Sequence, residues 1–456
     1  MLSHVTCVNF AELSTTEMAT GEPRAVGRAL NSQRLFSWGA NSYGQLGLGH
    51  CTDKSIPEEI NLSEDFGNVS SVSGGGGHTL VLTGKDFGNV SSVSGGGGHT
   101  LVLTGKDFGN VSSVSGGGGH TLVLTGKDFG NVSSVSGGGG HTLVLTDNGK
   151  LFVCGSNDKG QLGLGSTEDK TVLTPVGSME REIITKVVGG WDFTLMLNDK
   201  GIIFVTGSNK FNQLGLPDIT EKYITTPVRM FLPGNPVVLD IEAGLRHGIA
   251  LTDTGQVYIW GSRKSSKYKT GAVPTIVHLP EDTKGMVTKI TAGSYFFSAL
   301  TDHGEIISWG DNTYGQLSKN KVIQQPYLVP TTFFKGKVTD IQAGWTHMLA
   351  LTDQKKIYSW GRGNYGQLGR AVDLDPSPQV IGCHDNIACV RCGSEHNLAL
   401  TDKGRLLTWG WNEHGLCGNG NEDNVMTPSL VDKLNGYMIK TIGCGAGHSF
   451  LLVYPT

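Results

Sequence analysis

The chain has 456 residues, a formal net charge of −4 and a pI near 6.4, so it carries no overall positive field that would recruit nucleic acid or acidic lipid. No stretch approaches the roughly 20 apolar residues that a membrane-spanning helix needs. The eight cysteines are scattered without a paired framework, which is typical of a reducing compartment. We therefore expect a protein of the cytoplasm, extending to the nucleus, that neither binds nucleic acid nor inserts into a membrane.

The first 34 residues mix acidic with basic side chains, among them Glu12, Glu17, Arg24 and Arg28, and contain no apolar signal core. They match neither a secretory signal nor an acid-poor transit peptide. We expect residues 1–34 to be a disordered leader, as is common at chain termini.

From residue 35 onward the chain repeats one motif. The segment LFSWG is followed by a stretch that ends in GQLG, and this combination recurs with changes six more times. The intervals between the shared glycines are 49 to 54 residues, except for the first, which is 116. A period of this size indicates a repeat architecture. The marker glycines are Gly39, Gly155, Gly207, Gly261, Gly310, Gly361 and Gly410.

The long first interval contains a second, shorter repeat. The 21-residue segment DFGNVSSVSGGGGHTLVLTGK begins at Asp65, Asp86 and Asp107, and a fourth copy from Asp128 departs from the pattern after Thr146. Without the three surplus copies, residues 65–127, the interval is 53 residues. We expect these copies to protrude from, or lengthen, one repeat unit. Their identity indicates a very recent duplication or an artefact of sequence assembly.

One complete unit follows the surplus copies. Stretches rich in apolar and β-branched residues predict four strands, at 132–136, 142–146, 150–155 and 172–176. Asn148-Gly149 predicts a tight hairpin between the second and third strands, because this pair accepts the positive φ that such turns require. Four short antiparallel strands per fifty residues, seven times, predict an all-β, seven-bladed β-propeller over residues 35–454.

The two ends of the repeat array complement each other. The first unit begins at its third strand, Leu35 to Gly39, and the last segment, 441–453, supplies the two missing opening strands. We predict that a blade shared by both termini closes the ring and leaves no open edge.

Three recurring features favour structural roles over chemistry. The tryptophans before the marker glycines are expected to pack between blades. Cys389 and Cys392 lie three apart on a strand and so face opposite sides, which favours packing over a zinc or redox site. The Gly-x-x-His histidines come one from each unit and cannot cluster around a metal; we expect them to bridge neighbouring strands. They are His141, His247, His347, His396 and His448.

No motif for catalysis or cofactor binding is present. GHTLVLTGK, which ends at Lys85, has six residues where a phosphate-binding loop has four, and Asp86 follows where that loop needs Ser or Thr. We therefore expect no GTP hydrolysis by this chain, and no catalytic residue, cofactor or metal.

The units resemble regulator of chromosome condensation repeats over about residues 35–453. Stretches such as GGWDFTLML after Val188 and WGWNEHGLCG from Trp409 resemble the branch of that family formed by secretion-regulating guanine nucleotide exchange factors. The resemblance implies a propeller that accelerates nucleotide release from a small GTPase. Such a protein needs no reacting group, because binding the nucleotide-free GTPase more tightly than the loaded one is sufficient.

The resemblance is weaker to the exchange factor for Ran. Two positions that carry acidic residues in that protein carry Arg246 and Trp191 in this chain. Its wedge-like insertion is missing, because the segment from Gly207 to Gly215 has ordinary length. We therefore expect a GTPase other than Ran.

Binding residues of propellers usually lie on loops at one end of the ring, and Trp and Arg are enriched at interface hot spots. We expect a monomeric, protein-binding propeller that acts on a small GTPase or on secretory machinery. Two alternatives stay open: a scaffold that leaves the nucleotide unchanged, and an enzyme with a pocket on the ring axis, for which no acid, base or nucleophile is assembled. The candidate partner-binding residues are Trp191, Asp192, Arg246, Trp345, Glu395, Trp411, Glu413 and His414.

Overall fold

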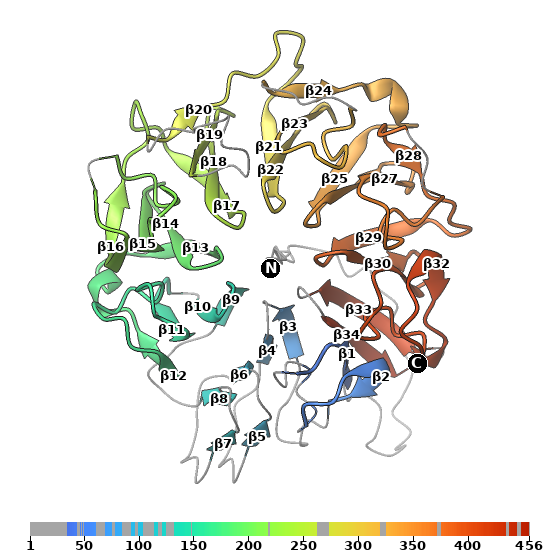
Figure 1. The fold of residues 1–456 in the computed structure, drawn as a ribbon, viewed down its shortest axis with the longest axis horizontal. Helices are drawn as coiled ribbons and strands as arrows, with labels where there is room; N and C mark the ends of the chain where they lie inside the picture. The colour runs from blue at the N-terminus through green and yellow to red at the C-terminus, as the bar shows by residue number, and fades with distance from the viewer. Residues whose placement is uncertain are drawn as a thin grey trace, which may run out of the picture.

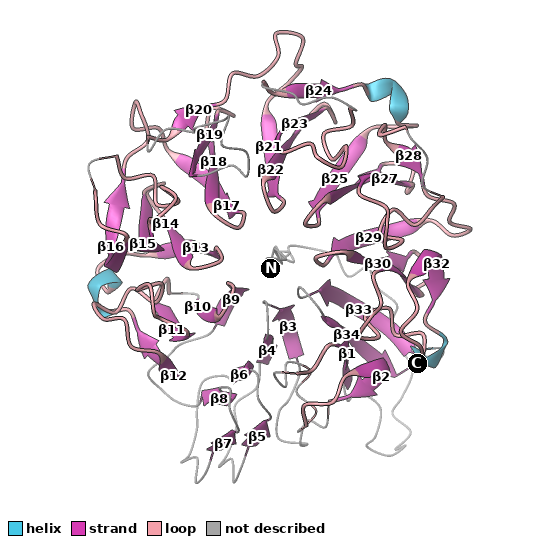
Figure 2. Cartoon of the chain, in the orientation of Figure 1, coloured by secondary structure: helices cyan, strands magenta, loops and turns pink. Residues whose placement is uncertain are grey.

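Seven four-stranded antiparallel sheets surround a central axis in the computed structural model of the chain (Figure 1). The predicted all-β, seven-bladed propeller is therefore confirmed. Among the described residues, three single-turn 3-10 helices lie at the outer side of the ring (Figure 2): η2 (Gly177–Met179), η3 (Thr331–Phe333) and η4 (Asp432–Leu434). The structure describes residues 34–42, 46, 48, 50–60, 132–146, 148–217, 219–261, 273–319, 325–371, 375–434, 437–444 and 448–455, and only strands between 61 and 131. Apart from Arg34, the expected leader lies outside the described residues.

Blades 1 to 3 each pair four consecutive strands, with the first strand nearest the axis (Figure 1). Blade 1 consists of β9 (Val132–Gly137), β10 (His141–Thr146), β11 (Leu151–Gly155) and β12 (Lys170–Pro175). Blade 2 consists of β13 (Ile184–Gly189), β14 (Phe193–Asn198), β15 (Ile203–Ser208) and β16 (Tyr223–Met230). Blade 3 consists of β17 (Val238–Ala243), β18 (His247–Thr252), β19 (Val257–Gly261) and β20 (Thr275–Ile276).

Blades 4 to 6 continue the same order around the ring. Blade 4 consists of β21 (Val287–Ala292), β22 (Phe296–Thr301), β23 (Ile306–Gly310) and β24 (Tyr327–Val329). Blade 5 consists of β25 (Val338–Ala343), β26 (His347–Thr352), β27 (Ile357–Gly361) and β28 (Gln379–Val380). Blade 6 consists of β29 (Ile387–Cys392), β30 (His396–Thr401), β31 (Leu406–Gly410) and β32 (Val425–Leu430).

The seventh sheet, here called the closing blade, combines both ends of the chain. Its strand order is β2 (Lys54–Glu59), β1 (Arg34–Gly39), β34 (His448–Pro455) and β33 (Tyr437–Cys444). β1 pairs antiparallel with β34, with Leu35 opposite Leu452 and Gly39 opposite His448. The two ends of the repeat array thus share one sheet.

The surplus copies form sheets of their own between the closing blade and blade 1. β3 (Val69–Gly74), β4 (His78–Thr83), β6 (His99–Leu103) and β8 (Thr121–Leu124) make one sheet, and β5 (Val93–Gly95) pairs with β7 (Val114–Gly116). β3 contacts β33 and β34 on one side and β9 on the other. Separate sheets differ from a lengthening of one blade, one of the two expected arrangements; β5 to β8 lie towards the outer side of the ring (Figure 1).

Identity of the copies explains that difference. β4, β6 and β8 pair in parallel, and each residue lies opposite its own equivalent, as His78 does opposite His99. Identical segments can align in register in this way. Each copy also lacks the LFVCG segment that forms the third strand of blade 1, so it cannot complete an antiparallel blade.

The marker glycine is required by backbone geometry at the end of the third strand. At Gly155 φ is +102°, and a Cβ would lie 2.6 Å from the carbonyl oxygen of Gly140. The pairing of β11 with β12 shifts register between Val153 and Gly155. Glycine alone accepts positive φ with the neighbouring backbone so close, which explains its presence in all seven units.

The hydrophobic core lies between adjacent blades. One cluster, for example, joins Phe193 and Leu195 of blade 2 to Ile241 and Trp260 of blade 3. All five tryptophans that precede a marker glycine are at most 2% exposed, which confirms that they are packing residues. A ring built in this way presents its loops on a stiff frame.

Ion pairs join neighbouring blades where the first strands line the axis. Lys186 of blade 2 contacts Asp240 at 2.5 Å and Glu242 at 3.0 Å, both in blade 3. Burial alone would lower the pKa of Lys186, but the two carboxylates raise it above the usual lysine value. In the same way, Lys289 of blade 4 pairs with Asp340 of blade 5.

Candidate partner-binding site

The two ends of the ring differ in the loops that they carry. In blade 5 the start of the second strand lies beside the end of the third, with His347 opposite Gly361, and the other blades repeat this register. Turns between the first and second strands therefore share one end, here called the loop end, with the connections between the third and fourth strands. Hairpins between the second and third strands form the opposite, hairpin end. All eight candidate residues belong to the loop end.

Trp191, Asp192 and Arg246 lie on neighbouring turns of blades 2 and 3. The guanidinium of Arg246 lies 4.0 Å from the centre of the Phe211 ring, and the ammonium of Lys210 lies 5.5 Å from that ring. The Trp191 side chain is 38% exposed. Here the structure presents cations on an aromatic face, and the turn of blade 2 carries a tryptophan that solvent reaches.

Strand register shows which residues of these two turns occupy equivalent positions. Asp192 and Arg246 each precede the residue that lies opposite a marker glycine, since Phe193 pairs with Gly207 and His247 with Gly261. Asp192, not Trp191, is therefore the structural equivalent of Arg246. Burial raises the pKa of Asp192, although a hydrogen bond of 3.1 Å from Gln213 Nε2 opposes this.

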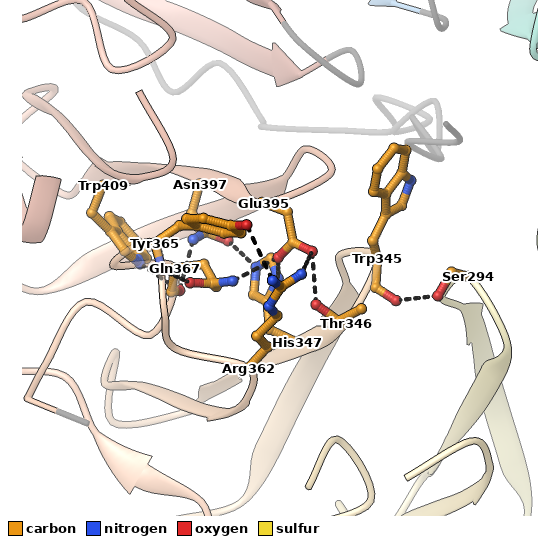
Figure 3. Close-up of polar contacts among 10 residues, drawn as sticks. All are labelled: Ser294, Trp345, Thr346, His347, Arg362, Tyr365, Gln367, Glu395, Asn397 and Trp409. Atoms are coloured by element: carbon orange, nitrogen blue, oxygen red, sulfur yellow. Dashed lines mark hydrogen bonds and ion pairs between the residues drawn. The ribbon is translucent and has the colours of Figure 1, made fainter. Parts of the chain in front are cut away.

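The backbone of Trp345, and not its indole ring, makes the hydrogen bonds that fix this turn. Its carbonyl oxygen accepts hydrogen bonds from the backbone N–H of Ser294 at 3.1 Å and from Ser294 Oγ at 2.6 Å, and its own N–H donates to Ser394 O at 2.8 Å. Figure 3 shows the indole pointing away from the neighbouring polar cluster. Among the described residues Trp345 Nε1 has no hydrogen-bond partner. These backbone hydrogen bonds hold the turn in place, while the half-buried indole makes no hydrogen bond to the described residues.

Glu395 is buried, in contrast to the other candidates. Its side chain is 6% exposed, and its carboxylate accepts hydrogen bonds of 2.7 Å from Thr346 Oγ1 and from Gln367 Nε2 (Figure 3). Arg362 Nη1 lies 3.6 Å from Oε1. These partners belong to blade 5, whereas Glu395 belongs to blade 6. Glu395 therefore connects blades 5 and 6, because side chains of blade 5 already contact the carboxylate oxygens that a partner protein would need.

Trp411, Glu413 and His414 lie on the β31–β32 connection. His414 Nδ1 is 2.8 Å from Asp53 Oδ2 of the closing blade, and the Trp411 and His414 rings meet edge-on with centroids 5.6 Å apart. Glu413 is exposed. His414 therefore connects blade 6 to the closing blade, whereas Glu413 is exposed and Trp411 is partly exposed.

The sequence interpretation missed the aromatic residues that precede the GQLG segment. Arg362 lies 4.8 Å from the ring centre of Tyr314 and 4.6 Å from that of Tyr365, and Tyr314 is 37% exposed. Phe211, under Arg246, occupies the same place in blade 2. The signal was present, since an aromatic residue stands two positions before the glutamine in these units, but pairing with arginine depends on the fold.

Three of the Gly-x-x-His histidines, His141, His347 and His396, join blades, where we had expected them to join strands. His141 Nε2 donates to Thr194 Oγ1 at 2.9 Å in the next blade, and that hydroxyl donates to Gln161 O at 2.7 Å back in blade 1. His347 makes the same connection through Asn397 at 2.7 Å. Burial lowers the pKa of His141 to about 4 and also lowers that of His347. The described residues contain no cluster that could hold a metal ion.

Cys389 and Cys392 are inert packing residues. Cys392 is buried and Cys389 is partly buried. Burial raises the pKa of both thiols, so neither is a ready nucleophile or metal ligand at neutral pH.

Comparison with known families and structures now adds to this geometry. The RCC1-like domain matches residues 125–451, and the regulator of chromosome condensation (RCC1) repeat matches residues 32–82. The chain belongs to the regulator of chromosome condensation repeat family. Membership confirms the resemblance seen in the repeated segments.

Relatives in this family include proteins named as exchange factors. The chain is 35% identical over 450 residues to the secretion-regulating guanine nucleotide exchange factor of Mus musculus, covering 91% of this chain and 82% of the relative. The protein of the same name from Bos taurus is 33% identical over 464 residues, covering 94% and 85%.

Solved structures support the fold. Human WBSCR16 matches with a TM-score of 0.63 at 21% identity, over 93% of this chain and 99% of that one. Prp20p of Saccharomyces cerevisiae, whose structure was described together with its binding properties to Gsp1p and histones, matches with a TM-score of 0.62 at 21% identity, over 94% and 93%.

Proposed function

We propose that this propeller is a guanine nucleotide exchange factor, or a regulator, of a small GTPase of the secretory pathway, and that the GTPase docks on the loop end. The relatives named for this activity support the proposal. The observation on which it chiefly depends is the pairing of Arg246 with Phe211 at the loop end, which also carries the solvent-accessible Trp191. Aromatic and arginine side chains of this kind dominate binding energy at protein interfaces.

Such a surface can accelerate nucleotide exchange only by binding one nucleotide state of the GTPase more tightly than another. A partner that holds the nucleotide-free GTPase more tightly than the loaded form shifts the equilibrium towards release. Rigid turns favour this, because the surface does not have to be ordered upon binding. Glu395 and His414 act as supports of the loop end, whereas Trp191, Arg246, Trp345 and Trp411 are the contact residues.

Release of a fluorescent GDP analogue from a panel of secretory GTPases, with Ran included, tests this function. Wild type is expected to accelerate release from at least one member other than Ran. Trp191→Ala and Arg246→Glu should each reduce the acceleration by on the order of tenfold. Lys337→Glu, at the hairpin end, is the control and should leave it unchanged.

Two outcomes would contradict exchange. Absence of acceleration across the whole panel excludes it for these GTPases. Binding that is equal for the GDP-loaded, GTP-loaded and empty forms, without acceleration, would instead favour a scaffold that uses the same end of the ring.

A further inference from the structure

Exposed apolar side chains gather on the hairpin end of three successive blades. Ile183, Val237 and Met286 stand directly before the first strands of blades 2, 3 and 4 and are 52%, 46% and 48% exposed. Phe231 and Leu239 are 58% and 60% exposed. Large apolar residues that cluster on the surface of a soluble protein usually mark a docking site.

The first three of these residues occupy one repeated position. The carbonyl oxygen of Ile183 accepts the N–H of Asp199, that of Val237 the N–H of Asp253, and that of Met286 the N–H of Asp302. The same backbone contact recurs in blades 5 and 6, where polar Lys337 and Asn386 occupy the position. The fold therefore does not demand an apolar residue there, and the apolar arc is a property of blades 2 to 4.

A cavity of about 210 Å³ opens within this arc, between blades 2 and 3. Its apolar wall includes Ile203, Met230, Leu232 and Val237. Small-molecule sites are usually larger, about 300–1,000 Å³. The size therefore favours a single large apolar side chain of a partner protein over a metabolite.

A preformed turn shapes this cavity. The connections that contain η2, η3 and η4 enter the next blade through a 3-10 turn, whereas the β16–β17 connection has the sequence FLPGNP after Met230. Asn235 N donates to Leu232 O at 3.0 Å, and Tyr258 Oη donates to Pro233 O at 3.0 Å. The two prolines and these hydrogen bonds hold the wall in place before any partner arrives.

Two cations line the cavity. Lys200 lies on the hairpin between β14 and β15, and Arg229 lies on β16, where its guanidinium is 4.5 Å from the ring centre of Phe231. Among the described residues neither cation makes an ion pair, whereas Lys403, at the hairpin position of Lys200 in blade 6, contacts Asp385 at 2.8 Å. The described lining of the cavity contains no carboxylate.

From this combination we propose a second docking surface, at the hairpin end of blades 2 to 4, for an acidic peptide segment of a partner protein. One large apolar side chain of the peptide enters the cavity between blades 2 and 3. Carboxylates on either side of that anchor pair with Lys200 and Arg229, and the flanking chain lies on the apolar arc. This surface lies at the opposite end of the ring from the proposed GTPase contact and does not depend on it.

Selection from a random nonapeptide display library against the full chain tests the proposal. Enriched peptides are expected to carry a large apolar residue flanked by Asp or Glu. In fluorescence anisotropy these peptides should bind Lys200→Glu/Arg229→Glu at least tenfold more weakly than wild type. Peptides with Lys in place of their acids should bind the double variant better than they bind wild type.

Matched variants separate this surface from the rest of the molecule. Val237→Ser should weaken the enriched peptides, whereas Lys337→Glu at the equivalent place in blade 5 and Trp191→Ala at the loop end should not. Thermal unfolding of each variant shows that the ring is intact. The proposal is overturned if no peptide is enriched, if the enriched peptides lack acidic residues, or if the double charge reversal leaves their affinity unchanged.

Discussion

A buried tryptophan in this ring provides both apolar volume and a hydrogen bond. Trp360 Nε1 donates to Gln316 O of the preceding blade at 2.9 Å, and Trp260 Nε1 donates in the same way to Gln213 O at 2.9 Å. Trp309 differs, because its Nε1 has no hydrogen-bond partner among the described residues. The unit before Trp309 has lost the GQLG segment that supplies the carbonyl elsewhere.

This contrast predicts unequal effects of one substitution. Trp360→Phe should lower the free energy of unfolding by about 1–3 kcal/mol more than Trp309→Phe, because it leaves a buried carbonyl without its donor. Both variants lose similar volume, so each is the control for the other. Denaturant unfolding measures the difference, and equal losses would show that the hydrogen bond contributes nothing.

Buried histidines make stability depend on pH. The pKa of His141 is about 4 in the folded chain, against an ordinary value of 6.5. The unfolded chain therefore binds a proton first as the pH falls, and stability decreases between pH 6.5 and pH 4. For His141 alone the loss is about 3 kcal/mol once the pH has fallen through this window.

His141→Phe is the test, because Phe193 and Phe296 occupy the same position in blades 2 and 4. The variant should show a shallower decrease in the free energy of unfolding between pH 6.5 and pH 4 than wild type. His347 has a lowered pKa for the same reason, so part of the dependence should remain. Identical pH profiles for the variant and wild type would refute the assignment.

At the scale of elements, the turn between β29 and β30 holds blade 6 against blade 5. Glu395 on this turn contacts Thr346, Gln367 and Arg362. Glu395→Ala should cost about 3 kcal/mol, because it leaves the Arg362 charge without its buried partner. Glu413→Ala, at an exposed loop position, should change stability by less than about 0.5 kcal/mol. Chemical denaturation compares the two, and similar values would mean that Glu395 is not a tie.

At the scale of the whole molecule, we expect the surplus sheets to be separable from the ring. Blade 1 takes β9 and β10 from the fourth copy, after residue 127. Without residues 65–127, β33 of the closing blade can face β9 directly, as β9 faces β13. The deletion should therefore leave a seven-bladed ring.

The deletion variant should keep the unfolding temperature of the full chain within a few degrees and accelerate nucleotide release from the partner GTPase as the full chain does. Calorimetry and the nucleotide-release assay provide the two readouts. A deleted chain that fails to fold, or unfolds well below the full chain, would show that the additional sheet is an integral part of the ring.

Much of the architecture could be predicted from local patterns. The marker glycines, the Asn-Gly hairpin and the alternating strands each depend on backbone geometry within a few residues, so the period and the blade content could be read directly. The parallel pairing of β4, β6 and β8 was not predicted. These strands come from different copies, and the sequence does not show which of several identical strands will pair. The burial of Glu395, a candidate partner-binding residue, could not be predicted, because it is produced by side chains of blade 5.

The number of units, the strands of each unit and the family could be predicted from the repeat, since its glycines and turns act locally. Which loop residues are supports and which are exposed depends on the tertiary structure. It alone brought Arg246 onto Phe211 at one end of the ring and joined Ile183, Val237 and Met286 into one arc at the other. The physical reason is that these groups come from blades about fifty residues apart, and their distances and exposure are set by how the blades pack.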